Sequence, residues 1–231
     1  MSDLGRCTLA VLLMALACSG RNGVERPAAS HMYDHFQRAS HIQMSIIEGR
    51  LERARGPATW MAEHERAEGL PATAEPYVAD MRSMARRIAY AETLAEAAAA
   101  TAAMGRTCGA CHDAVEGGPR IEVTSGPPVR EGLTGRMILH VWGADRLWEG
   151  LIGPSDDAWG AGLAAFHDAT LVPADITEAG EPTEEIRALS REVRTLSVEA
   201  GRTLDWQVRA EIYGRLLGTC SRCHALVGVN R

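Results

Sequence analysis

Residues 108–112 read Cys-Gly-Ala-Cys-His, and residues 220–224 read Cys-Ser-Arg-Cys-His. Each pentad is a CxxCH motif, and the Cys and His frequencies of the 231-residue chain predict only about 0.005 such pentads by chance. On a helical turn, two cysteines with this spacing place both thiols on one side of a planar ring. The next residue, a histidine, then points its imidazole at a metal in the centre of that ring. The spacing therefore predicts covalent haem attachment at both motifs.

We expect the two motifs to hold two haem c groups. The thioether bonds and the proximal iron ligands would come from Cys108, Cys111 and His112 and from Cys220, Cys223 and His224. A shared zinc site is a weaker interpretation, because 108 residues separate the two CxxC pairs. A thioredoxin-like redox site is also weaker, because no strand-like alternation surrounds either motif.

The two halves of the chain share a second pattern. Residues 32–39 and 137–144 both read M-x-x-H-apolar-x-x-A, at an offset of 105 residues, whereas the CxxCH motifs lie 112 residues apart. The difference of seven residues corresponds to about two helical turns, which preserves the buried face of a helix. The pattern indicates a duplicated helical unit.

The remaining sequence favours helices throughout, so the expected fold class is all-α. Ala and Leu dominate and aromatic residues make up 5%. We divide the chain into a first unit at 30–116, a Gly- and Pro-rich linker at 117–130 and a second unit at 131–231. Expected helices cover 30–54, a segment opening at Pro57, two segments within 76–112 that meet near 90–93, then 132–151 and 155–168. A loop at 173–182 precedes two more helices, with a turn near Gly201 and Asp205 as an N-cap.

The N-terminus has the features of an export signal. Residues 1–17 contain an uncharged stretch that is too short to span a bilayer, followed by a small-x-small cleavage pattern. Cys18 comes next and opens a polar tether at 18–29. The arrangement resembles a bacterial lipoprotein signal, which implies acylation of Cys18 and a periplasmic, membrane-anchored protein; soluble export is the alternative.

A four-helix unit with CxxCH in its last helix resembles the class II cytochromes c, the cytochrome c′ type. The resemblance covers about residues 30–115 and 131–229 and implies two tandem four-helix bundles. In that family a residue of the first helix faces the distal side of the haem, and its identity decides between an electron carrier and a gas-binding site.

Counting along the first helix of each half places four residues on that distal face. The candidates for the distal axial ligand are Met32 and His35 in the first unit and Met137 and His140 in the second. Met ligation, His ligation and an open site all remain possible outcomes. The other histidines within the two units are expected to be surface or partly buried helix residues: His31, His41, His64 and His167.

These observations favour a periplasmic dihaem cytochrome that transfers electrons rather than an enzyme. The net charge of −6 argues against nucleic-acid binding and favours a redox partner with a basic docking patch. All 24 basic residues are Arg, which excludes a Lys Schiff base or a P-loop Lys. The alternative is a haem protein with an open distal site that binds NO or CO or reacts with peroxide.

Overall fold

The protein is helical, as the composition predicts. The computed structural model describes residues 27–64, 69–115, 118–128, 131–179 and 183–228, and these contain helices and no strand. In the first half lie α1 (Pro27–Ile47), α2 (Leu51–Glu63), a single 3₁₀ turn (Ala72–Ala74), α3 (Glu75–Ala89) and α4 (Leu94–Ala114). The second half holds α5 (Gly132–Ile152), α6 (Asp156–Asp168), α7 (Pro173–Ala179), α8 (Thr183–Ala200) and α9 (Trp206–Val227).

Three helix boundaries differ from the sequence-based expectation. The helix expected at 30–54 is interrupted after Ile47, because Gly49 adopts a left-handed backbone conformation (φ 73°) that turns the chain. The next helix begins at Leu51, so Pro57 lies inside α2 and does not open it. The expected loop at 173–182 contains the short helix α7. The turn at 90–93 and the N-cap at Asp205 are confirmed.

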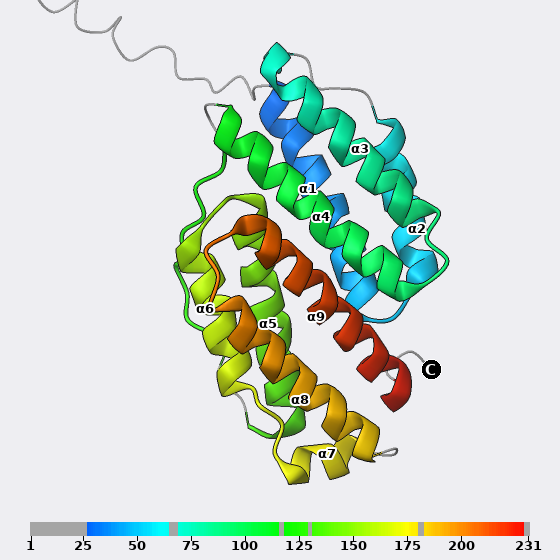
Figure 1. The fold of residues 1–231 in the computed structure, drawn as a ribbon, viewed down its shortest axis with the longest axis vertical. Coiled ribbons are helices and arrows are strands. Elements are labelled where there is room, and N and C mark those ends of the chain that lie inside the picture. The colour runs from blue at the N-terminus through cyan, green and yellow to red at the C-terminus, as the bar shows by residue number, and fades with distance from the viewer. Residues whose placement is uncertain (1–26, 65–68, 116–117, 129–130, 180–182, 229–231) are drawn as a thin grey trace, which may run out of the picture.

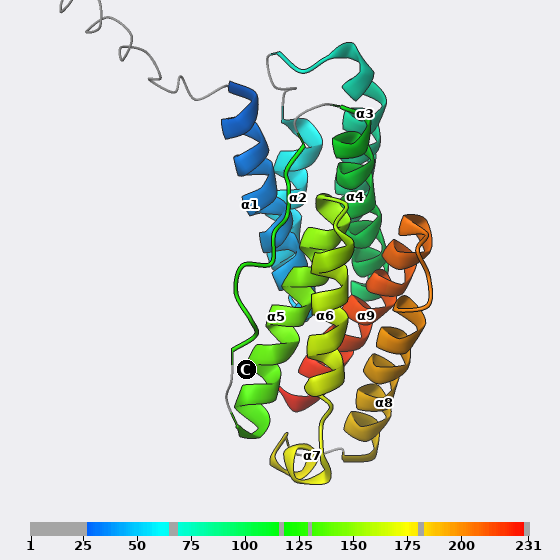
Figure 2. The ribbon, with the colours of Figure 1, turned by 90° about the vertical axis from the view of Figure 1, so that its left-hand side faces the viewer.

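Within each half, helices that follow one another in sequence pack side by side. The helix α2 contacts α1 and α3, α3 contacts α4, and α4 returns to α1. In the second half α6 contacts α5 and α8, α8 contacts α9, and α9 returns to α5, while α7 packs between α5 and α8 at one end (Figure 2). Both halves thus bring their first and last long helices into contact.

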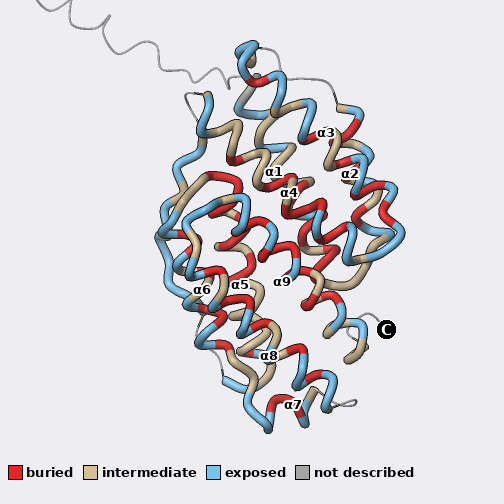
Figure 3. The backbone as a smooth tube through the Cα atoms, in the orientation of Figure 1, coloured by how far each residue is buried: buried red, intermediate tan, exposed pale blue. Residues whose placement is uncertain are grey.

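The two halves are joined through their last helices. The helices α4 and α9 lie side by side and run in opposite directions through the middle of the molecule (Figure 1). Their contact is close because small residues form it: a Cβ added to Gly214 would lie 3.1 Å from the Cα of Ala99. Burial is concentrated along this pair (Figure 3), and Tyr213 and Trp148 are among the largest fully buried side chains.

Local capping fixes where these two helices begin. Thr93 and Glu96 form a reciprocal capping box at the start of α4, in which each side chain accepts a backbone N–H of the other residue. The Asp205 carboxylate accepts the backbone N–H groups of Gln207 and Val208 at the start of α9. Each cap lies about four turns before its CxxCH motif, so both motifs fall in the last turns of long helices.

Candidate functional site

The first CxxCH motif lies in the last two turns of α4. Cys108 and Cys111 are half-buried and form no disulfide. Burial raises the pKa of the Cys108 thiol to about 12 and also raises the pKa of Cys111. At neutral pH both side chains are therefore neutral thiols on the same side of one helix.

The second motif repeats this arrangement in the last turns of α9. Cys220 and Cys223 are half-buried, unpaired thiols. Burial raises the pKa of Cys220 to about 12 and raises that of Cys223. The two motifs thus present the same donor set from the ends of the two central helices.

The histidine of each motif is oriented by a backbone carbonyl of the other half. The Nδ1 of His112 lies 2.7 Å from the carbonyl oxygen of Ile152, and the Nδ1 of His224 lies 2.7 Å from that of Ile47. Because a carbonyl only accepts, Nδ1 carries the proton in both rings and Nε2 keeps its lone pair. Burial lowers the pKa of both histidines, which favours this neutral form. Histidines that bind a metal through one ring nitrogen typically donate the N–H of the other to a carbonyl or carboxylate in this way.

The two hydrogen bonds are equivalent under the sequence repeat. The acceptors Ile47 and Ile152 are 105 residues apart, the offset of the M-x-x-H pattern, and the donors are 112 residues apart, the offset of the CxxCH motifs. Each acceptor is the last residue of the first helix of its half. Each half therefore supplies the carbonyl that binds the motif histidine of the other half.

The predicted distal residues of the second half, His140 and Met137, are half-buried on α5. His140 is bound through Nε2 to the carbonyl oxygen of Ala169 at 3.0 Å and packs against Phe166. Its pKa is lowered to about 4, chiefly by burial, and the charge of His224 contributes to the lowering. The two histidines therefore interact electrostatically. Met137, one turn before His140 on α5, is half-buried.

The predicted distal residues of the first half have different surroundings. Met32 is half-buried near the start of α1. His35 is also half-buried, and its buried Nε2 has no hydrogen-bond partner. Its pKa is lowered to about 3, first by burial and then by the charges of His31, His64 and two arginines.

His31, His35 and His64 form a cluster that the sequence does not predict. One potential ligand atom from each lies within 4.8 Å of the other two. His31 and His35 are one turn apart on α1, and their ring centroids are 4.2 Å apart. His64 caps the C-terminal end of α2 and stacks on Trp60 at 3.7 Å. The spacing of His31 and His35 can be recognised in the sequence, but the position of His64 beside them depends on how α2 packs against α1.

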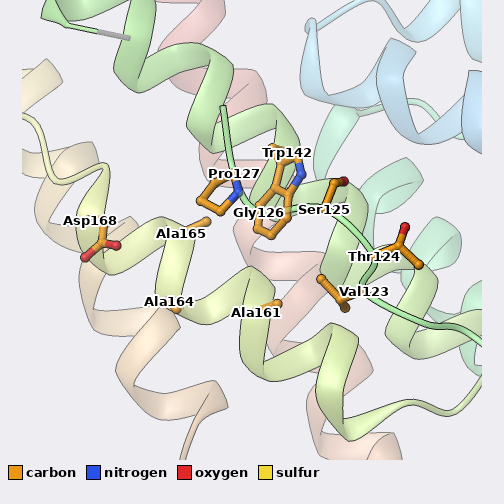
Figure 4. A pocket seen from close by; sticks show the side chains of 10 residues that line it. All are labelled: Val123, Thr124, Ser125, Gly126, Pro127, Trp142, Ala161, Ala164, Ala165 and Asp168. Atoms are coloured by element: carbon orange, nitrogen blue, oxygen red, sulfur yellow. The ribbon is translucent and has the colours of Figure 1, made fainter. Parts of the chain in front are cut away.

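A separate hollow of about 360 Å³ lies on the second half. It is formed where residues 123–127 cross α5 and α6, with Trp142 as one wall and Asp168 at its edge (Figure 4). The residues lining it include none of the predicted haem-binding side chains, so it is distinct from the two motifs.

Cys18 and residues 1–26 lie outside the described part of the chain, so the predictions of a signal, a tether and an acylated cysteine stay predictions. Among the helices that the structure describes, none has the length and apolar character required to cross a bilayer. No protein-family model, curated protein or solved structure matches this chain.

Proposed function

We propose that this chain is a dihaem c-type cytochrome that carries electrons between redox partners outside the cytoplasmic membrane. The observation that carries the proposal is the pair of CxxCH motifs whose histidines are held in the same way, with Nδ1 donating to a backbone carbonyl and Nε2 unprotonated. A chance motif would not explain the same oriented imidazole at both positions.

The donor set of each motif fits a covalent haem. Each thiol adds across one vinyl group, so that a carbon–sulfur bond forms and the thiol hydrogen passes to the other vinyl carbon. Two half-buried thiols about one turn apart on one helix suit this addition, and the unprotonated Nε2 of His112 or His224 suits iron. A bound haem would supply reversible one-electron chemistry, and the histidine of each motif would hold its iron.

We further propose that the fold is two tandem bundles of the cytochrome c′ type. The first consists of α1 to α4, and the second of α5, α6, α8 and α9, with α7 inserted between two of its helices. The neighbour relations within each half support this assignment, as does the position of each motif at the end of the last helix.

The distal ligands are proposed from the first helix of each half. In the second half, the charge of His224 acts on His140, which favours His140 as the distal ligand. Met137, on the same face of α5, is the alternative. In the first half the candidates are Met32 and His35. A ligand at both sixth positions would make an electron carrier; an open position would favour binding of NO or CO or reaction with peroxide.

The acidic surface and the export-like N-terminus support the proposed setting. A net charge of −6 would steer the protein to a basic patch on its redox partner. Acylation of Cys18 would hold the protein at a membrane beside that partner. We propose a periplasmic location on these grounds.

Expression in a bacterium that attaches haem to exported proteins tests the proposal. Mass spectrometry of the denatured parent protein should show two covalently bound haems. Replacing Cys108 and Cys111 by Ala, or Cys220 and Cys223 by Ala, should remove one haem each. Covalent haem that is absent from the parent, or retained when all four motif cysteines are replaced by Ala, would refute it. A ferrous spectrum unchanged by CO supports electron transfer, and one that shifts with CO supports the gas-binding alternative.

A further inference from the structure

The cluster of His31, His35 and His64 has the composition of a metal site. Its three potential ligand atoms lie within 4.8 Å of one another, and the rings are half-buried between the start of α1 and the end of α2. His35 is the central member, since its Nε2 is buried and has no hydrogen-bond partner. A buried imidazole nitrogen without a partner is costly, and a bound ion would satisfy it.

The distances are close to those of a three-imidazole site. Nitrogens bound to one Zn²⁺ at about 2.0–2.1 Å in tetrahedral geometry lie about 3.4 Å from one another. The observed separations exceed this value by about 1.4 Å at most. Small side-chain rotations on two packed helices would close that difference.

The neighbouring charges select the kind of metal. Arg82 donates a hydrogen bond to the carbonyl oxygen of His64, and the guanidinium of Arg38 lies 4.1 Å from the centre of the Trp60 ring. These cations oppose any ion held mainly by charge, such as Ca²⁺ or Mg²⁺, which also prefer oxygen ligands. An imidazole set suits Zn²⁺ and related transition metals, which form strong bonds to nitrogen.

The described residues of the second half contain no equivalent cluster, although this half shares the repeat. Arg136 stands at the position equivalent to His31, and it forms an ion pair with Asp175 at 2.6 Å. His140 is equivalent to His35, but its Nε2 is bound to the carbonyl oxygen of Ala169. In the second half the residues equivalent to His31 and His35 thus both have partners, whereas the Nε2 of His35 in the first half has none.

We propose that His31, His35 and His64 bind a zinc-class divalent transition metal, with a fourth position left for water or another small ligand. This site is separate from the two haem motifs. It assigns His35 to the metal, which leaves Met32 as the distal candidate at the first haem.

Titration of the protein, purified with both haems attached, with Zn²⁺ in a calorimeter tests the site. We expect one Zn²⁺ per chain and no change in the haem absorption spectrum. His31→Gln and His64→Gln should each weaken the affinity at least about tenfold, since removing a residue that merely orients a ligand already costs about 10- to 100-fold. His167→Gln, which changes an exposed histidine outside the cluster, should bind as the parent does.

Three outcomes would overturn the proposal: no binding by the parent, unchanged affinity in the His31 and His64 variants, or a haem spectrum that changes with Zn²⁺. Circular dichroism establishes that each variant is folded. The absorption spectrum of the protein with Co²⁺ in place of Zn²⁺ distinguishes a failure of this proposal from a failure of the proposed function. Thiolate-to-cobalt absorption would mean that the metal sits on haem-free CxxCH cysteines, whereas a spectrum without it, lost in the His64 variant, supports the histidine site.

Discussion

Three polar side chains meet in the apolar centre of the molecule, at the junction of α1, α5 and α9. The hydroxyl of Tyr213 donates to the carbonyl oxygen of Ala144 at 3.1 Å and accepts from the amide nitrogen of Gln43 at 3.0 Å. The same amide donates to Asp145 at 3.4 Å. Gln43 belongs to the first half and the other residues to the second, so the network fixes how the halves meet.

Tyr213→Phe tests this network at the level of one oxygen atom. The ring of Tyr213 is fully buried, so the Phe variant keeps its packing but removes one acceptor and one donor. We expect the free energy of unfolding to fall by about 1–2 kcal/mol in urea titrations. Tyr90→Phe is the control. Tyr90 is 80% exposed, so this variant should unfold at the same urea concentration as the parent. Equal stability of both variants would contradict a stabilising network.

Asp145 gives a prediction with a definite pH dependence. Its pKa is raised above the ordinary value of 3.8 by burial, so the folded state binds the proton more tightly than the unfolded state does. The charged carboxylate therefore lowers stability at pH 7, and Asp145→Asn should unfold at higher urea concentration there. The advantage should shrink as the pH falls through the raised pKa and vanish below 3.8. An Asn variant that is less stable at pH 7 would show that the charge itself is needed.

At the scale of elements, the end of α4 approaches the end of α5 too closely for a side chain. A Cβ added to Gly109 would lie 2.2 Å from the carbonyl oxygen of Leu151, which is backbone and has little freedom to move. Gly109 is thus the residue that lets His112 reach the carbonyl of Ile152. The first intervening residue of this CxxCH motif is constrained by packing between the halves.

Gly109→Ala should lower the free energy of unfolding by about 1–3 kcal/mol or more, because the helices must separate. The matched control is Gly160→Ala in α6, where an added Cβ meets no atom within 4 Å. That variant should be stabilised by up to about 1 kcal/mol, the helix propensity difference between Ala and Gly. Thermal melts of both proteins give the comparison, and a neutral Gly109 variant would contradict the close approach.

The sequence predicted elements well where a local signal exists. Asp205 is predicted as an N-cap because its side-chain chemistry needs no tertiary contact, and the turn predicted near 90–93 ends at the Thr93 cap. The break after Ile47 was missed because apolar residues continue at helical spacing across Gly49, and the left-handed turn there carries only one glycine as its signal. The histidine cluster and the crossed carbonyl contacts were also missed, since both depend on which helices pack together. The haem and its distal ligands remain predictions.

At the scale of the whole molecule, the contacts between the halves are reciprocal and buried. Each motif histidine is oriented by the other half, and α4 packs on α9 through small residues where Gly214 meets Ala98, Ala99 and Ala102. Trp148 of α5 fills the space beside Gly105 of α4, where an added Cβ would lie 2.5 Å from its ring. Neither half therefore has a complete core or a fully oriented histidine by itself.

We accordingly predict one cooperative unfolding transition, although the sequence divides into two similar units. Far-ultraviolet circular dichroism reports helix content, and fluorescence reports tryptophan burial. Both signals should change at the same urea concentration. Gly214→Leu places a bulky side chain against Ala99 at the junction and should lower that single midpoint, whereas Gly160→Leu on the exposed face of α6 should change it little. If Gly214→Leu instead splits the transition into two, the halves fold independently and the junction adds only to their association. A single shifted midpoint would mean that the orientation of each motif histidine persists only while the whole molecule is folded, so that both proposed haem sites are gained and lost together.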